Sequence, residues 1–135
     1  MTGLDPDRIA LRFVNEINRH DTAALSTLMS TDVRFVDGLG QELWGKDRMC
    51  DAWTAYFAMF PDYRIVVRDH LTLGPVVAFF GTASGTYAVG SELPAQNRWS
   101  IPAAWRVVVR EGLVTEWQVY ADNDPVRKLV GPKIH

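Results

Sequence analysis

One pattern, WSIPAAWRVVVREGLVTEWQVYA at residues 99–121, sets the type of fold. Apolar side chains occupy every second position from residue 99 to residue 109, which is the period of a strand with one buried face. Glu111-Gly112 then gives a hairpin signal, and residues 113–121 continue as another strand. The pattern therefore predicts two long, neighbouring antiparallel strands.

The chain before this hairpin is predicted to form helices first and strands afterwards. Ile9, Phe13 and Ile17 have helical spacing after Asp5-Pro6, a helix-start signal. Period-two alternation indicates strands at 63–73 and 76–87. The other expected elements are a helix from Asp21 or Thr22 to Thr31, strands at 33–36 and 41–44, a helix at about 46–60, a loop at 88–98, and a short turn or helix from Asp122 to near Gly131. His20, in the connection between the first two helices, is expected to be solvated.

Alternation also predicts which faces the strand residues share. Within 63–73 it places one set of side chains together, namely Ile65, Val67, Asp69, Leu71 and Leu73. His70 falls on the other, more polar face. Gly81 and Gly85 in the next strand suggest bends or bulges.

The order of helices followed by antiparallel strands predicts an α+β fold with the helices on one face of a curved sheet. We expect about three helices packed on a mainly antiparallel sheet, in a single domain spanning residues 1–135. A strongly curved sheet closed by helices has an interior, which the 15 aromatic side chains (5 Trp, 4 Tyr and 6 Phe) can line as a pocket.

Composition excludes several functional classes. The net charge of −2 and the scattered arginines argue against a nucleic-acid surface. The single cysteine, Cys50, excludes an internal disulfide and is expected to be a partly buried helix residue. Three histidines without ligand-like spacing predict no metal site. The N-terminus has no signal segment and no apolar run is long enough to span a bilayer, so we expect a cytoplasmic protein without membrane contact.

Asp37 is the first candidate catalytic residue. It ends the apolar run Val33-Arg34-Phe35-Val36 and precedes Gly38. A strand end can hold a carboxylate rigidly, and an apolar cavity desolvates it and makes it a better proton acceptor. The alternative is a structural role, because an Asp-Gly pair is common in turns.

The chain resembles nuclear-transport-factor-2-like (NTF2-like) proteins in Asn18-Arg19-His20-Asp21, Val33-Arg34-Phe35 and Gly45. Further on, Gly81-Thr82-Ala83-Ser84-Gly85, Glu111-Gly112-Leu113-Val114 and Trp117 resemble the SnoaL-like polyketide cyclase and ketosteroid-isomerase-like group of that superfamily. The resemblance implies a cone-shaped fold, enzymes that generally need no cofactor, and homodimers paired through the sheet.

The same resemblance implies roles for particular residues. Asp37 matches the position of the ketosteroid isomerase general base, while Phe13 stands where that enzyme has its hydroxyl donor. Asp122 is close to the acidic position of SnoaL-like cyclases, although it can also cap the terminal turn. His70 is a third acid–base candidate, and Tyr56 can replace the missing hydroxyl. The expected substrate-binding wall is aromatic: Phe13, Trp44, Trp53, Tyr56, Phe57, Tyr87, Trp105 and Trp117, with Trp99 and Tyr120 as further candidates.

These features support a cofactor-independent enzyme that uses carboxylate acid–base chemistry on a hydrophobic polyketide- or steroid-like small molecule. The expected reaction is an isomerisation or an aldol-type cyclisation. A non-catalytic small-molecule-binding module is the alternative, because both oxyanion donors of the isomerase are absent: Phe13 replaces the tyrosine, and the place of the aspartate falls near Ala103, Ala104 or Trp105. A dimeric interaction protein with a collapsed pocket is the third hypothesis.

Overall fold

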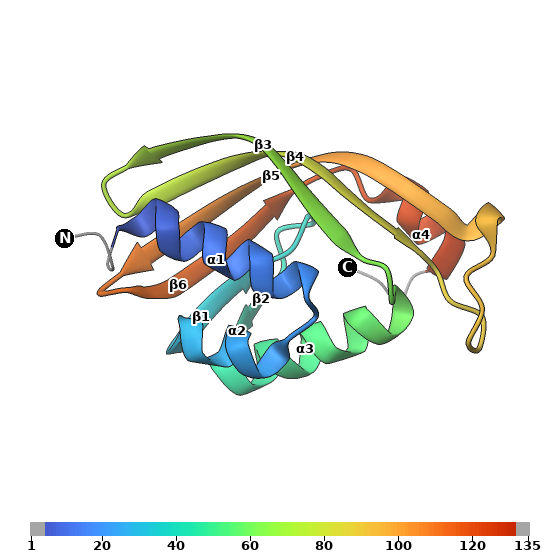
Figure 1. Cartoon of the computed structure of the whole chain (residues 1–135), viewed down its shortest axis with the longest axis horizontal. Coiled ribbons are helices and arrows are strands. Elements are labelled where there is room, and N and C mark those ends of the chain that lie inside the picture. Colours follow the sequence, from blue (N-terminus) through green and yellow to red (C-terminus); the bar gives the residue numbers. More distant parts are fainter. Residues whose placement is uncertain (1–4, 132–135) are drawn as a thin grey trace.

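The two strands predicted within residues 99–121 lie side by side near the centre of a six-stranded sheet (Figure 1). A computed structural model describes residues 5–131 and gives these strands as β5 (Arg98–Arg110) and β6 (Leu113–Tyr120). Their antiparallel ladder runs from Ala104 paired with Tyr120 to Arg110 paired with Leu113. The hairpin signal at Glu111-Gly112 is confirmed by the positive φ of both residues.

The other strands complete the order β2-β1-β6-β5-β4-β3. They are β1 (Met29–Val36), β2 (Glu42–Trp44), β3 (Arg64–Leu73) and β4 (Val76–Thr86). All the neighbouring pairs are antiparallel except β1 and β6, which are parallel. The N-terminal strand thus lies beside the last strand of the chain.

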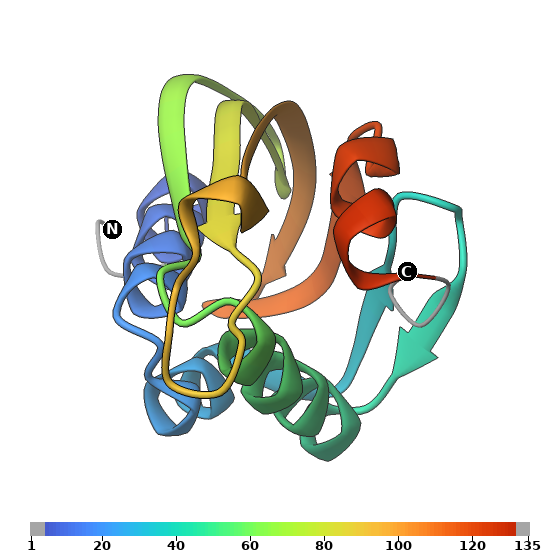
Figure 2. The same ribbon diagram turned by 90° about the vertical axis from the view of Figure 1, so that its right-hand side faces the viewer.

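The helices cover the concave side of this sheet. α1 (Pro6–Asn18), α2 (Thr22–Leu28) and α3 (Lys46–Met59) precede the long strands, as predicted. A short 3₁₀ turn (Ala95–Asn97) precedes β5, and α4 (Asp124–Val130) follows β6, where the sequence predicts a short turn or helix. Figure 2 shows α3 beneath the curved sheet, with α1 at one side and α4 at the other. The α+β cone predicted from the sequence is therefore confirmed.

The expected faces of β3 are correct only for its first half. The register shifts between Val67 and Asp69, so Ile65 and Val67 share a face that Asp69 and Leu71 do not. A bulged residue moves every later side chain of the strand to the opposite face. The bulge also explains Gly81, because a Cβ there would lie 1.8 Å from the Val66 carbonyl oxygen.

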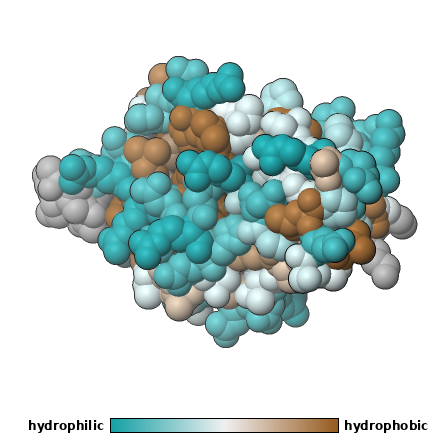
Figure 3. Space-filling model, turned by 45° about the vertical axis from the view of Figure 1, so that its right-hand side comes forward, coloured by the Kyte–Doolittle hydropathy of each residue, from teal (hydrophilic) through white to brown (hydrophobic). Residues whose placement is uncertain are grey.

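The concave side of the sheet and the helices share a continuous hydrophobic core. Phe13, Ile17, Phe60, Phe79 and Trp117 are among its largest fully buried side chains. Elsewhere apolar side chains reach the surface in separate groups between hydrophilic ones (Figure 3). None of the helices in residues 5–131 is long and apolar enough to cross a membrane.

His20 is not the solvated residue that the sequence suggested. Its ring stacks on Phe57, with centroids 4.1 Å apart and planes 7° apart. Its Nε2 atom lies 2.9 Å from the Tyr63 carbonyl oxygen, and its φ is 56°. His20 therefore links the turn between α1 and α2 to the start of β3.

Candidate functional site

A cavity of about 290 Å³ lies between α3 and the concave face of the sheet. β5 contributes Trp99, Ile101, Ala103 and Trp105, every second residue of one strand. The other lining residues are Phe35, Asp37, Met49, Ala52, Trp53, Ala55, Tyr56, Met59, Tyr63, Ala83, Trp117, Val119, Ala121 and Asn123. The cavity is thus a mostly apolar and aromatic pocket at the lower end of the size range of small-molecule sites, about 300–1,000 Å³.

Asp37 lines this cavity and is 6% exposed. Its Oδ1 atom accepts hydrogen bonds from the backbone N–H groups of Leu39 and Gln41, each at 2.9 Å. Its backbone N–H donates to the Gln41 carbonyl at 2.9 Å. No hydrogen bond within the described residues reaches Oδ2. One carboxylate oxygen therefore fixes the turn, and the other takes no part in it.

Asn123 is a cavity residue that the sequence-based prediction missed. Its backbone carbonyl caps α4 by accepting from Val126 and Arg127, but its side chain makes no capping hydrogen bond. Asparagine is strongly favoured at this position because its side chain usually does cap the helix. Here the amide instead lies against Gly38, where an added Cβ would be 3.0 Å from Nδ2. The amide therefore lies next to Gly38, the residue that follows Asp37, and Asn123 and Asp37 both line the cavity.

Tyr56 and Tyr63 add two hydroxyl groups to the cavity wall. Their rings meet edge to face, with centroids 4.9 Å apart. Burial raises the pKa of Tyr56 and of Tyr63 well above the ordinary value of 10.0, and for Tyr63 the nearby Tyr56 adds to the rise. Both hydroxyls therefore keep their protons at neutral pH and can donate hydrogen bonds.

Only some of the aromatic residues predicted to bind the substrate line the cavity. Trp53, Tyr56, Trp105 and Trp117 line the cavity, as does Trp99. The others do not line it. Phe13 is buried in the core, 5.1 Å from the Trp117 ring, and Phe57 is buried between His20 and Trp53. Tyr87 packs against Phe60, while Trp44 and Tyr120 are exposed.

Two of the three acid–base candidates lie outside the cavity. Asp122 is exposed, and its Oδ1 atom accepts from the Asp124 N–H at 3.0 Å, which is the turn-capping alternative considered for it. His70 is exposed on β3 opposite Phe79. The bulge places His70 on the same face of the sheet as Phe79, but His70 does not line the cavity. Of these three candidates, only Asp37 is placed where a bound ligand can reach it.

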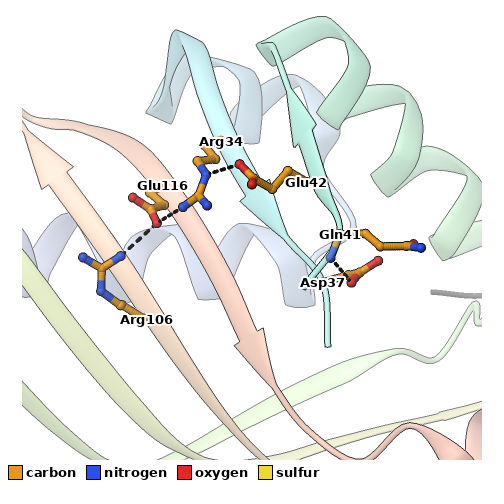
Figure 4. Close-up of polar contacts among 6 residues, drawn as sticks. All are labelled: Arg34, Asp37, Gln41, Glu42, Arg106 and Glu116. Carbon is orange, nitrogen blue, oxygen red and sulfur yellow. Dashed lines mark hydrogen bonds and ion pairs between the residues drawn. The ribbon is translucent and has the colours of Figure 1, made fainter. Parts of the chain in front are cut away.

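Ion pairs on the face of the sheet that points away from the cavity link β1, the strand that precedes Asp37, to its neighbours (Figure 4). Arg34 donates to Glu42 and to Glu116, each at 2.5 Å. Arg106 donates to the same Glu116 oxygen at 2.9 Å. These contacts join β2, β1, β6 and β5 on this face.

Asp37 is the one His, Cys, Asp or Glu side chain among the residues that line the cavity. Within the described range, no group of three or more His, Cys, Asp or Glu side chains gathers as a ligand set. Cys50 is half-buried outside the cavity, and burial raises the pKa of the Cys50 thiol, which makes it a poor nucleophile near neutral pH. The cavity therefore presents one carboxylate, Asp37, together with hydrogen-bond donors from Tyr56, Tyr63 and Asn123.

Known structures share this architecture. A candidate SnoaL-like polyketide cyclase from Shewanella denitrificans OS-217 superposes with a TM-score of 0.80 at 14% identity, covering 93% of this chain and 96% of its own. A hypothetical protein with a ketosteroid isomerase-like fold from Catenulispora acidiphila DSM 44928, in complex with trimethylamine, gives 0.77 at 19% identity, covering 91% and 92%. TerC, co-crystallised with polyporic acid, gives 0.75 at 17% identity, covering 93% and 97%.

At these identities the structures show a common fold and not a common activity. A search of curated proteins finds no match to the chain. The family model for the SnoaL-like domain matches residues 10–117, which include the strand leading to Asp37, all of α3 and most of the sheet. The chain therefore belongs to the SnoaL-like domain family.

Proposed function

We propose that this protein is an enzyme that moves a proton at a carbon next to a carbonyl group, with Asp37 as the base. The observation that carries the proposal is the setting of Asp37, which is buried at the wall of an apolar cavity with Oδ2 free. The substrate would be a hydrophobic small molecule of the polyketide or steroid type. The similarity to a candidate polyketide cyclase supports this class.

The reaction would proceed through an enolate. Asp37 Oδ2 takes the proton from the carbon, and the electrons of the C–H bond move so that the carbonyl oxygen becomes negative. If the proton returns to a different carbon, the reaction is an isomerisation. If the enolate carbon attacks another carbonyl carbon of the same molecule, the π bond of that carbonyl opens to an alkoxide, which takes the proton back from Asp37, and the result is an aldol-type ring closure.

The negative oxygen needs hydrogen-bond donors, and the cavity supplies them. Asn123 lies beside Gly38, the residue that follows Asp37, so its Nδ2–H is well placed to stabilise an oxygen formed near the base. The protonated Tyr56 hydroxyl, expected from the sequence as a substitute donor, lines the same cavity. These groups fill the role for which Phe13 has no hydroxyl.

The alternative is a binding module without catalysis. The turn contacts of Asp37 Oδ1 favour it, because a carboxylate can be retained for that structural role alone. The two functions differ in one measurable respect. A binder holds a ketone without exchanging its hydrogens with solvent, whereas the proposed enzyme exchanges them.

Asp37→Asn tests the base directly. The amide keeps an acceptor for Leu39 and Gln41 but cannot take a proton. We expect the rate at which a bound tetralone exchanges its α-hydrogens in deuterated water, followed by NMR, to fall by roughly 10²–10⁴-fold. Calorimetric affinity for the tetralone should stay within about twofold of the unmodified protein.

Asp122→Asn is the matched control, because Asp122 is an exposed carboxylate outside the cavity. It should exchange the ketone at the unmodified rate. Equal exchange rates in Asp37→Asn and the unmodified protein would exclude Asp37 as the base. Binding of the ketone without any exchange by the unmodified protein would favour the binding module.

A further inference from the structure

We propose that Ala103 is a specificity-determining residue of the cavity, which sets how large the part of the substrate remote from Asp37 can be. The substrate would place its reacting carbon at Asp37 and lay the rest of its ring system over Ala103 on β5. This role rests on the proposed function for what happens at Asp37. The contact with Ala103 follows from the accessible surface of the cavity alone.

Ala103 faces the cavity and still has accessible surface. Its neighbours in the β5 row, Ile101 and Trp105, also line the cavity but are only 6% and 2% exposed. Ala103 is half-buried, although it packs against the hydrophobic core. Because a ligand can contact only surface that solvent can reach, the open space of this row lies over Ala103.

The neighbouring strand β6 is open at the same place. Val119 and Ala121 line the cavity and are half-buried. Ala104 pairs with Tyr120, so Ala103 and Ala121 are the residues next to this pair in the two adjacent segments. Two alanine methyl groups therefore form the floor under the open space.

Ala103 lies two strands away from the end of β1, where Asp37 stands. Val36 pairs with Gln118 in the parallel ladder of β1 and β6, and Asp37 follows Val36. β6 in turn pairs with β5. Adjacent strands are about 4.8 Å apart, so Ala103 lies roughly 10 Å across the sheet from the end of β1. A ketone with one small ring fills only the Asp37 side of this span, and a second fused ring extends it over Ala103.

A larger side chain at position 103 would occupy the space that the second ring needs. Valine is suited to such a change, because β-branched residues favour strands and the backbone of β5 can stay as it is. One methylene more or less in an apolar pocket changes the discrimination between substrates by roughly 10–200-fold. The small side chain of Ala103 therefore admits a fused ring, and a bulkier one would restrict the site to smaller ketones.

Two ketones that differ by one fused ring test this role, namely β-tetralone and cyclohexanone. In Ala103→Val the affinity for β-tetralone, measured by NMR titration, should fall by roughly tenfold or more, while that for cyclohexanone stays within about twofold. Ala103→Leu should lower the affinity for β-tetralone further. Unchanged binding of β-tetralone by Ala103→Val would overturn the proposal, and so would an equal loss of affinity for both ketones.

Ala104→Val is the matched control. Ala104 is the next residue of the same strand and is also half-buried, but it does not line the cavity. Successive side chains of a strand point to opposite faces of the sheet, so the added methyl groups lie away from the ligand. Both affinities should match those of the unmodified protein. A loss of β-tetralone affinity as large as that of Ala103→Val would refute a direct contact with Ala103.

Protein labelled with ¹³C in its alanine methyl groups gives a measurement that needs no filled cavity. The aromatic protons of bound β-tetralone should show nuclear Overhauser effects to the Ala103 methyl group of the unmodified protein and none to that of Ala104. Loss of one resonance in Ala103→Gly assigns the Ala103 signal. Absence of the effect at Ala103 would refute the contact.

Asp37→Asn separates this role from the proposed function. The loss of β-tetralone affinity caused by Ala103→Val should persist in the Asp37→Asn background, because contact with a ring does not need a base. If α-hydrogen exchange is unaffected by Asp37→Asn while the affinity loss remains, only the proposed base fails. If exchange depends on Asp37 but Ala103→Val binds β-tetralone normally, only the role of Ala103 fails.

Discussion

Asp37 uses its two carboxylate oxygens for different tasks. Oδ1 holds the Leu39 and Gln41 N–H groups, and this fixes the direction of Oδ2 without any help from a ligand. A base that is already oriented loses little entropy when the substrate binds. The turn-capping role and the proposed catalytic role are therefore compatible in one residue.

Gly38 lies directly against the side chain of Asn123. Gly38→Ala would place a methyl group 3.0 Å from Asn123 Nδ2 and 3.2 Å from the Ala121 carbonyl oxygen, so the amide must move. If Asn123 stabilises the enolate, Asn123→Ala should slow α-hydrogen exchange roughly 10–100-fold. Gly38→Ala should slow it by a smaller factor.

The double variant separates displacement of Asn123 from a general disturbance. In the Asn123→Ala background, Gly38→Ala should have little further effect on exchange, because the group that it displaces is gone. Additive losses in the double variant would mean that Gly38→Ala acts through some other contact.

The sequence identified part of this site and could not identify the rest. Trp105 and Trp117 were predictable because strand alternation assigns their face. Asn123 gave no signal, since an asparagine before Asp124-Pro125 is explained by helix capping alone. Trp44 and Phe57 were indistinguishable from Trp53 by residue type, because only the packing of β2 and α3 decides which ring faces the cavity.

Strand β3 contains a bulge between Val67 and Asp69, where it pairs with β4. Gly81→Ala should destabilise the protein by roughly 3 kcal/mol, because its Cβ would overlap the Val66 carbonyl and β3 would have to separate from β4. Urea unfolding followed by circular dichroism measures the loss.

Gly74→Ala is the comparison for this prediction. Gly74 has a φ of +58°, and a Cβ added there would meet open space, so the cost is backbone strain of about 1 kcal/mol. Similar losses for Gly74→Ala and Gly81→Ala would mean that strand contact at the bulge is not the reason for Gly81.

Element boundaries were predictable where side chains alternate. Residues 76–87 and 99–110 were expected, and β4 (Val76–Thr86) and β5 (Arg98–Arg110) are observed. β1 was expected only from Val33 but begins at Met29, because Met29 pairs with Val114 in a parallel ladder. That pairing joins distant parts of the chain and leaves no local pattern. The one-residue bulge of β3 was likewise invisible to a count of alternating positions.

At the scale of the whole molecule, the buried tyrosines make stability depend on pH. The folded pKa of Tyr63 lies above the unfolded value of 10.0, so the stability from its buried neutral hydroxyl is complete below pH 10 and is lost as pH rises beyond it. The free energy of unfolding should then fall by up to about 1.4 kcal/mol per pH unit for this one group.

Tyr63→Phe isolates this effect, because it removes the ionisable group and keeps the ring. Urea unfolding of both proteins at a series of alkaline pH values should show a shallower decline for the variant. Identical slopes would show that Tyr63 ionises as readily in the folded protein as in the unfolded chain.

The pairing of β1 with β6 has a consequence for how the protein is made. During synthesis Asp37 emerges early, but Val119, Ala121 and Asn123, which share its side of the cavity, are among the last described residues to be added. Contacts between such distant segments form late, because the intervening chain must first be brought together. A ribosome-stalled chain that ends before β6 should therefore contain Asp37 but lack a complete cavity, and the proposed α-hydrogen exchange should appear only when the C-terminal segment is released.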